Sequence, residues 1–165
     1  MFRSAMTLDR TARVVTGIVS AIVVVPVAIA LFTGTHTFGL LGLLLGVVLG
    51  LAWAMSPKAV TVRGDELCVE RRAWVPLRVP LASIASASPL GSLGSGTIRL
   101  FGVGGFFGSY GLHSNGSLGR FRLYATRRGQ AVLVRRNGSE LPIVLTPDDV
   151  AGTIEAIDRR PVLQA

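Results

Sequence analysis

The residues that could take part in catalysis are few and isolated from one another. Residues 102–111 hold five glycines, and a glycine-rich loop can surround a phosphate group with its backbone N–H groups. This segment lacks the G-K-[ST] ending of a phosphate loop, and Phe107 stands where G-x-G-x-x-G requires its third glycine. We therefore expect a tight turn or bulge filled by aromatic side chains, and no nucleotide site.

Nucleophiles, general bases and metal ligands do not cluster either. No serine lies in a G-x-S-x-G sequence, and His113 has no acidic residue within twenty positions on either side. Cys68 is the only cysteine and His36 is far from His113 in the sequence, so neither a disulfide nor a zinc pattern is present. We expect no catalytic residue, cofactor site or metal site, and hence no enzyme.

Arginine residues carry the remaining chemical signal. The chain has 17 Lys and Arg against 9 Asp and Glu, which gives a formal net charge of +8. In the expected strand 119–126, alternation places Phe121 and Leu123 on one face and Tyr124 on the other, with two arginines beside it. The predicted cationic face consists of Arg120, Arg122, Arg127, Arg128, Arg135 and Arg136.

This cationic face allows two interpretations. Each Arg near an anionic leaflet contributes about 1 kcal/mol of attraction, which predicts the lipid bilayer and its anionic headgroups as partners. A solvated positive surface with no ligand explains the same composition, and this alternative stays open. Nucleic acid is not expected as the target, because a membrane lies closer to the domain in the organisation that follows.

The elements that carry these residues begin with a long apolar segment. No charged residue lies between Arg13 and Lys58, and the mean hydropathy of the whole chain is +0.56. One helix needs about 20 residues to cross a bilayer, and the segment divides around residues 34–37 into 14–33 and 38–55. The sequence therefore predicts a two-helix transmembrane hairpin.

The charges that flank the apolar segment predict its orientation. Arginines precede the first span and basic residues follow the second, whereas the turn between them carries no Lys or Arg. By the positive-inside rule both termini lie in the cytoplasm, which predicts a multi-pass protein of the bacterial cytoplasmic membrane. A cleaved signal peptide is the rival interpretation, because Ala28-Ile29-Ala30 has the small-x-small form of a cleavage site.

Glycines recur every fourth residue along the second span, at Gly42, Gly46 and Gly50. Such a stripe allows two helix backbones to approach closely. It predicts either an interface between protomers or packing within the hairpin on Gly17 and Ala21 of the first span. A homo-oligomer and a membrane protein partner are both compatible with it.

From residue 59 onward, short β-branched runs separated by Gly, Pro, Asn and Asp indicate a small β domain. Gly64-Asp65 predicts one hairpin turn and Asn137-Gly138 a second. Prolines restrict the third strand to an edge or a strand end, and residues 85–96 are expected to form a Ser/Gly-rich connection. The predicted strands span residues 60–62, 66–70, 74–80, 97–101, 119–126, 131–136 and 141–146.

A helix is expected to close the domain. Thr146 is predicted as its N-cap, with Asp148 and Asp149 at the positive end of its dipole, and the helix should run to about Arg159. Its apolar stripe has to pack on the sheet. That stripe consists of Val150, Ile154 and Ile157. Strands and helix together predict a small β-roll or partly open barrel.

Four features occur together: a two-span hairpin leading directly into a strand, the Gly/Phe-rich block 100–111, the aromatic strand 118–126 and the final helix. In these features nearly the whole chain resembles the membrane-anchored bacterial proteins with a pleckstrin-homology-like (PH-like) domain. The resemblance implies an α+β membrane protein whose cytoplasmic module serves binding and assembly, with no catalytic residues to carry over. Phosphoinositide-binding PH domains place basic residues around the first hairpin, whereas this turn reads Gly64-Asp65-Glu66, so headgroup recognition of that kind is not expected.

The sequence thus predicts an integral membrane protein that presents a PH-like binding or scaffold module at the inner leaflet. The module would engage a protein, a second copy or the lipid surface. The alternative is an accessory subunit of a membrane enzyme or transporter, with the glycine stripe as its docking face. The expected division is an N-terminal cytoplasmic segment 1–13, the hairpin 14–55, the PH-like domain 57–160 and a tail 161–165.

Overall fold

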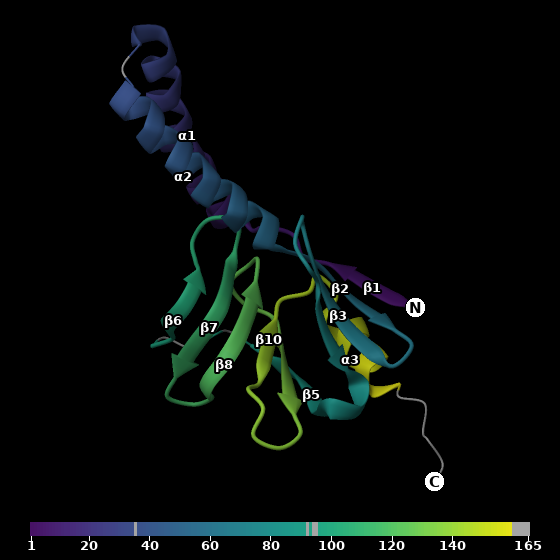
Figure 1. Cartoon of the computed structure of the whole chain (residues 1–165). Coiled ribbons are helices and arrows are strands. Elements are labelled where there is room, and N and C mark those ends of the chain that lie inside the picture. The colour runs from purple at the N-terminus through teal and green to yellow at the C-terminus, as the bar shows by residue number, and fades with distance from the viewer. Residues whose placement is uncertain (35, 92, 94–95, 160–165) are drawn as a thin grey trace.

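The computed structural model describes residues 1–34, 36–91, 93 and 96–159. Two long helices form a hairpin that stands on a domain of two β-sheets and a short helix (Figure 1). The chain therefore has an α+β fold, as predicted. The predicted tail 161–165 lies outside the described residues.

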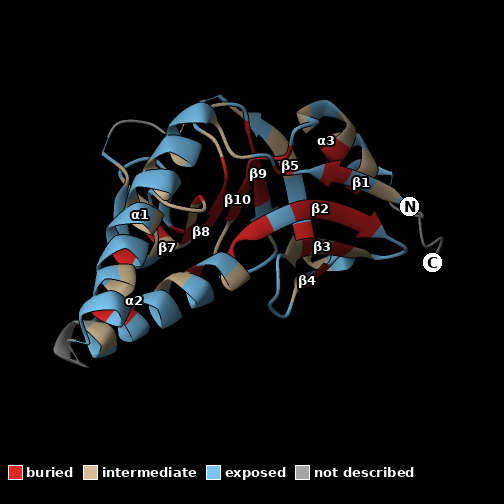
Figure 2. Ribbon diagram, turned by 90° about the horizontal axis from the view of Figure 1, so that it is seen from above, coloured by how far each residue is buried: buried red, intermediate tan, exposed pale blue. Residues whose placement is uncertain are grey.

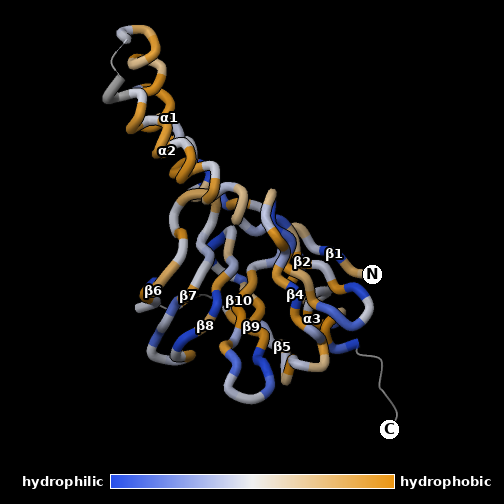
Figure 3. The backbone as a smooth tube through the Cα atoms, in the orientation of Figure 1, coloured by the Kyte–Doolittle hydropathy of each residue, from blue (hydrophilic) through white to orange (hydrophobic). Residues whose placement is uncertain are grey.

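The hairpin consists of α1 (Arg10–Thr33) and α2 (His36–Met55). α1 begins earlier than predicted because Asp9 caps it, accepting a hydrogen bond from the Ala12 N–H. Among the described residues, α1 is the one helix long and apolar enough to cross a membrane, and the described apolar part of α2, Gly39–Met55, is shorter. Figure 3 shows hydrophobic residues along both helices, and Figure 2 shows that most of them are exposed.

The first sheet has four antiparallel strands in the order β1-β2-β3-β4. They are β1 (Phe2–Ala5), β2 (Pro57–Arg63), β3 (Glu66–Arg71) and β4 (Leu77–Pro80). The turn at Gly64-Asp65 and the edge position of β4 are confirmed. β1 was not expected: it precedes α1 and pairs with β2 after α2, with Phe2 opposite Val62.

The second sheet has six strands in the order β5-β9-β10-β8-β7-β6, in which β10 runs parallel to β8 and antiparallel to β9. A short 3-10 helix, η1 (Leu81–Ser83), leads into it. Its strands are β5 (Ile84–Leu90), β6 (Ile98–Val103), β7 (Ser109–Asn115), β8 (Gly119–Ala125), β9 (Ala131–Arg136) and β10 (Ile143–Leu145).

Two of these strands differ from the prediction. β5 occupies part of the expected connection 85–96, and β7 begins within the glycine-rich block, at Ser109. Both contain Ser and small residues that have low intrinsic strand preference. Their ladders with β9 and β8 supply the order that their own composition does not indicate. The turn at Asn137-Gly138 between β9 and β10 is confirmed.

The main hydrophobic core lies between the two sheets. Val60 and Leu67 from the first sheet and Val134 from the second are fully buried there. The predicted stripe of the closing helix is confirmed, because Ile157 is fully buried and Ile154 packs against this core.

The second sheet is covered on its other face as well. Phe121 and Leu123 are buried there, together with residues of β9 and β10. The predicted alternation along β8 is confirmed, because Arg120 and Arg122 on the opposite side are exposed, but the cationic face ends before Tyr124. Tyr124, on the side of Arg120 and Arg122, is only 6% exposed and belongs to the main core.

The closing helix is α3 (Val150–Asp158). Its N-cap is Asp149, whose carboxylate accepts a hydrogen bond from the Gly152 N–H at 2.8 Å. The prediction of Thr146 as the cap was wrong, because the Thr146 hydroxyl instead accepts a hydrogen bond from the Thr126 N–H at 2.9 Å. Thr146, directly after β10, therefore binds the residue that directly follows β8.

Replacing the cap tests this assignment. Asp149→Ala leaves a helix N–H without its acceptor and should lower the free energy of unfolding by about 1 kcal/mol. Urea unfolding of the full chain in detergent, followed by circular dichroism, measures the change. Asp158→Ala at the exposed opposite end of α3 is the control, and an equal loss in both variants would contradict a capping role for Asp149.

Candidate functional site

The last turn of α2 is capped by side chains outside the helix. A helix leaves its last four carbonyl oxygens without helical partners. The Tyr110 hydroxyl on β7 donates a hydrogen bond to the Ala52 carbonyl, and Ser56 donates to the Trp53 carbonyl through its N–H at 3.1 Å and its Oγ at 2.7 Å. Burial raises the pKa of Tyr110 to about 12, so its hydroxyl stays a proton donor. Ser56 alone separates α2 from β2.

The β3–β4 loop, residues 72–76, is fixed at the same junction. The Ala73 N–H donates a hydrogen bond to the Ala54 carbonyl at 3.0 Å. Arg72 donates to Ser56 twice, from its N–H to the carbonyl at 3.1 Å and from its Nε to Oγ at 3.1 Å. The base of the loop is therefore tied to the end of α2, while its tip at Trp74 remains exposed.

The start of α1 is held by the loop that follows β8. The Asp9 N–H donates a hydrogen bond to the Thr126 carbonyl at 3.2 Å. The Asp9 carboxylate accepts one from the Ala12 N–H at 2.6 Å and one from the Arg128 N–H at 3.3 Å. One carboxylate thus caps α1 and links it to the second sheet.

The glycine-rich block ends β6, begins β7 and supplies the connection 104–108 between them, which contacts α1. Phe107 has a φ of 55°, and its N–H donates a hydrogen bond to the Thr16 Oγ1 at 2.9 Å. Phe106 and Phe107 are half-buried and meet edge to face, with ring centroids 6.0 Å apart. The block therefore braces the helical hairpin.

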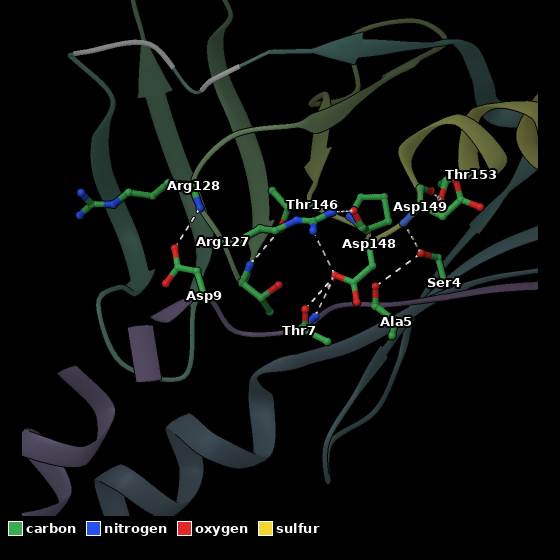
Figure 4. Close-up of polar contacts among 12 residues, drawn as sticks. Ser4, Ala5, Thr7, Asp9, Arg127, Arg128, Thr146, Asp148, Asp149 and Thr153 are labelled. Atoms are coloured by element: carbon green, nitrogen blue, oxygen red, sulfur yellow. Dashed lines mark hydrogen bonds and ion pairs between the residues drawn. The ribbon is translucent and has the colours of Figure 1, made fainter. Parts of the chain in front are cut away.

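The N-terminal segment is tied to the start of α3 (Figure 4). The Asp148 carboxylate accepts hydrogen bonds from the Thr7 N–H at 3.2 Å and the Thr7 hydroxyl at 3.0 Å, and forms an ion pair with Arg127 at 3.4 Å. The Asp149 N–H donates to the Ser4 Oγ at 2.9 Å. Asp148 therefore binds the N-terminal segment rather than serving the helix dipole as predicted.

The structure separates the six predicted surface arginines into two groups. Arg127 and Arg128 lie beside Asp9 at the start of α1. The other four lie at the opposite end of the second sheet, because the start of β8 and the end of β9 share that end. Those four are Arg120, Arg122, Arg135 and Arg136.

One arginine of each group is engaged by other residues. Arg127 is engaged by Asp148 and the Pro147 carbonyl, and Arg136 by Glu140. Figure 3 shows hydrophilic residues at the strand ends farthest from the hairpin, where the second group lies. The predicted single arginine patch is therefore not present in the structure.

The glycines of the predicted stripe also differ from one another in their surroundings. A Cβ added at Gly42 would collide with the Val27 side chain on α1, so Gly42 packs within the hairpin. Gly46 and Gly50 have nothing within 4 Å of such a Cβ, and the same is true of Gly17. The predicted contact with Gly17 is thus replaced by Val27, and the lower part of the stripe is open.

A cavity of about 590 Å³ lies against the second sheet at the start of α1. It is lined in part by Ala12, His113 and Thr126. His113 is 5% exposed, and burial lowers its pKa below the usual 6.5, so the imidazole is neutral. The His113 ring stacks on Phe121, and its Nδ1 lies 3.4 Å from the Gly111 carbonyl oxygen. No cluster of metal ligands occurs within the described part of the chain.

Sequence reasoning missed the residues that matter most at this junction. In the sequence, Tyr110 stands out only as part of the glycine-rich block, and Asp9 only as an acid among the arginines that flank the apolar segment. Asp9 did carry a signal, because an Asp directly before an apolar helix is a common N-cap. The partners of Tyr110 and Ser56 are set by tertiary contacts and leave no sequence pattern.

Comparison with known families gives one match. The family described as Bacterial PH domain matches residues 58–160, which is more than half of the chain. The matched segment contains β3 to β10 and α3, and it excludes the helical hairpin and β1. No curated protein and no solved structure matches the chain.

Gly42 contacts α1 whereas Gly46 faces open space, so the same substitution at the two positions should have different effects on stability. Gly42→Ile forces a branched side chain against Val27 and should destabilise the hairpin by about 1–3 kcal/mol. Gly46→Ile meets open space and should leave the monomer as stable as the parent. Thermal unfolding in detergent measures both, and equal loss in the two variants would show that both glycines pack against α1.

Buried His113 predicts a pH dependence. Its folded pKa is lowered, so its contribution to stability is complete above the unfolded value of 6.5 and is lost as the pH falls towards the folded value. The thermal midpoint of the parent should therefore decline in that window, and His113→Gln should flatten the decline. Glu70 acts separately, because the Thr61 hydrogen bond lowers its pKa from 4.5 and its loss begins at lower pH. An unchanged decline in His113→Gln would assign the effect to another group.

Proposed function

The chain belongs to the bacterial PH domain family, and from this premise we propose that it is an integral membrane protein that presents a PH-like binding module at the inner leaflet of the bacterial cytoplasmic membrane. The module is non-enzymatic and engages a protein, a second copy or the lipid surface. The helical hairpin crosses the bilayer twice, and both termini lie in the cytoplasm.

The pairing of β1 with β2 carries this proposal. β1 precedes α1 and β2 follows α2, yet Phe2 lies opposite Val62 in one sheet. Two crossings return the chain to its starting side, whereas one crossing would separate the two strands by a hydrocarbon layer of about 30 Å. The uncharged apolar surface of the two helices over residues 14–55 suits that layer.

The same pairing argues against a cleaved signal peptide. Cleavage after Ala30 would remove β1 and its contacts with the rest of the domain. Arg3 on β1 forms an ion pair with Glu70 on β3 at 3.1 Å, and Met6 is 2% exposed in the main core. A segment packed in this way supports retention of the N-terminus.

An accessory subunit of a membrane enzyme or transporter is the second candidate. An apolar groove of about 1090 Å³ lies between α1 and α2 and is lined in part by Val27, Gly46 and Val47. A transmembrane helix of a partner would fit such a groove. Purification from detergent separates the candidates: a stoichiometric membrane protein partner favours the accessory subunit, and self-association alone favours the binding module.

Cysteine accessibility tests the topology. In a Cys68→Ser background, Thr33→Cys at the hairpin tip should react with a membrane-impermeant thiol reagent in intact cells. Ser139→Cys in the β9–β10 turn should react only after the membrane is permeabilised. Labelling of Ser139→Cys in intact cells would overturn the proposed orientation.

A further inference from the structure

The tip of the β3–β4 loop exposes apolar side chains beside the end of α2. Trp74 is 46% exposed and Val75 is 73% exposed. The base of the loop is held rigidly, since Ala73 binds the Ala54 carbonyl and Arg72 binds Ser56. Figure 1 shows the loop rising from β3 and β4 along the base of the helical hairpin.

The two tryptophans of the chain lie at the same level of the molecule. Trp53 belongs to the last turn of α2 and is 44% exposed, and the residue after it, Ala54, is bound by the loop that carries Trp74. Tryptophan prefers the boundary between lipid headgroups and acyl chains, because its ring is apolar and its N–H is polar. Trp53 and Trp74 therefore lie at one level of the molecule, where the hairpin joins the β domain.

Basic side chains extend from the chain segments at this junction. Arg10 and Arg13 in the first turns of α1, Lys58 at the start of β2 and Arg72 in the loop are all exposed. The nearby acid Asp9 is already engaged by the Ala12 and Arg128 N–H groups. An apolar tip with a cationic surround matches an anionic membrane surface.

We propose that the β3–β4 loop inserts Trp74 and Val75 into the interfacial layer of an anionic bilayer, beside the hairpin. Arg10, Arg13, Lys58 and Arg72 then face the lipid phosphates. This inference rests on the proposed membrane anchoring and adds the surface of the domain that meets the lipid. It replaces the predicted role of Arg120 and Arg122, which lie at the far end of the sheet.

Two single-tryptophan variants of the full chain test the proposal separately from the anchoring. Trp53→Phe leaves Trp74 as the only reporter, and Trp74→Phe leaves Trp53. Each is reconstituted in phosphatidylcholine–phosphatidylglycerol vesicles, with and without lipids brominated near the headgroup end of the acyl chain. Emission is measured with brominated lipid as the membrane quencher and acrylamide as the aqueous one.

Both reporters should lose most of their emission to brominated lipid and resist acrylamide. Quenching of Trp53 but not of Trp74 would overturn the loop insertion and leave the anchoring intact. Quenching of neither would overturn the anchoring and the insertion with it. The two proposals therefore fail in distinguishable ways.

Charge-reversal variants test the contribution of the basic residues around the loop. In the Trp53→Phe background, Arg10→Glu with Arg13→Glu should reduce the lipid quenching of Trp74 in anionic vesicles, and rising salt should reduce it in the Trp53→Phe protein itself. Arg120→Glu with Arg122→Glu is the matched control at the distant end and should leave the quenching unchanged. Equal loss in the two double variants would contradict the proposed orientation of the domain on the membrane.

Discussion

The unsatisfied backbone groups at the ends of two apolar helices are the constraint on which the rest of the structure depends. A helix end buried without hydrogen-bond partners is costly, and here the β domain supplies them. Tyr110 and Ser56 satisfy carbonyls of α2, and Asp9 caps α1 while binding the loop after β8. The domain is therefore joined to the hairpin by several directional contacts instead of a flexible linker.

This rigid junction gives the β domain two unlike ends. The end near the hairpin carries the braced loops and Trp74, and the opposite end carries Arg120, Arg122 and the turn between β9 and β10. Surfaces at the two ends cannot both meet one flat membrane. In the proposed topology, the distal end points into the cytoplasm and is free to meet a protein partner.

The parts of the fold that depend on local patterns were predictable from the sequence. The apolar helices, the turns at Gly64-Asp65 and Asn137-Gly138 and the stripe of α3 were found because hydropathy period and turn chemistry act over a few residues. β1 was missed because its partner lies beyond two long helices. The arginine face was misjudged because strand alternation alone does not show that a sheet is covered on both sides. The junction residues were missed because their partners are remote in sequence.

Pairing of the first strand with a segment beyond both long helices sets an order of events during synthesis. β1 leaves the ribosome before the hairpin, and β2 follows only after the whole hairpin has been made. Until then the backbone N–H and C=O groups of β1 have no strand to pair with, and such an edge attracts other chains. Closure of the first sheet is thus a late step of biogenesis. A nascent chain arrested within the hairpin therefore displays β1 as an unpaired strand.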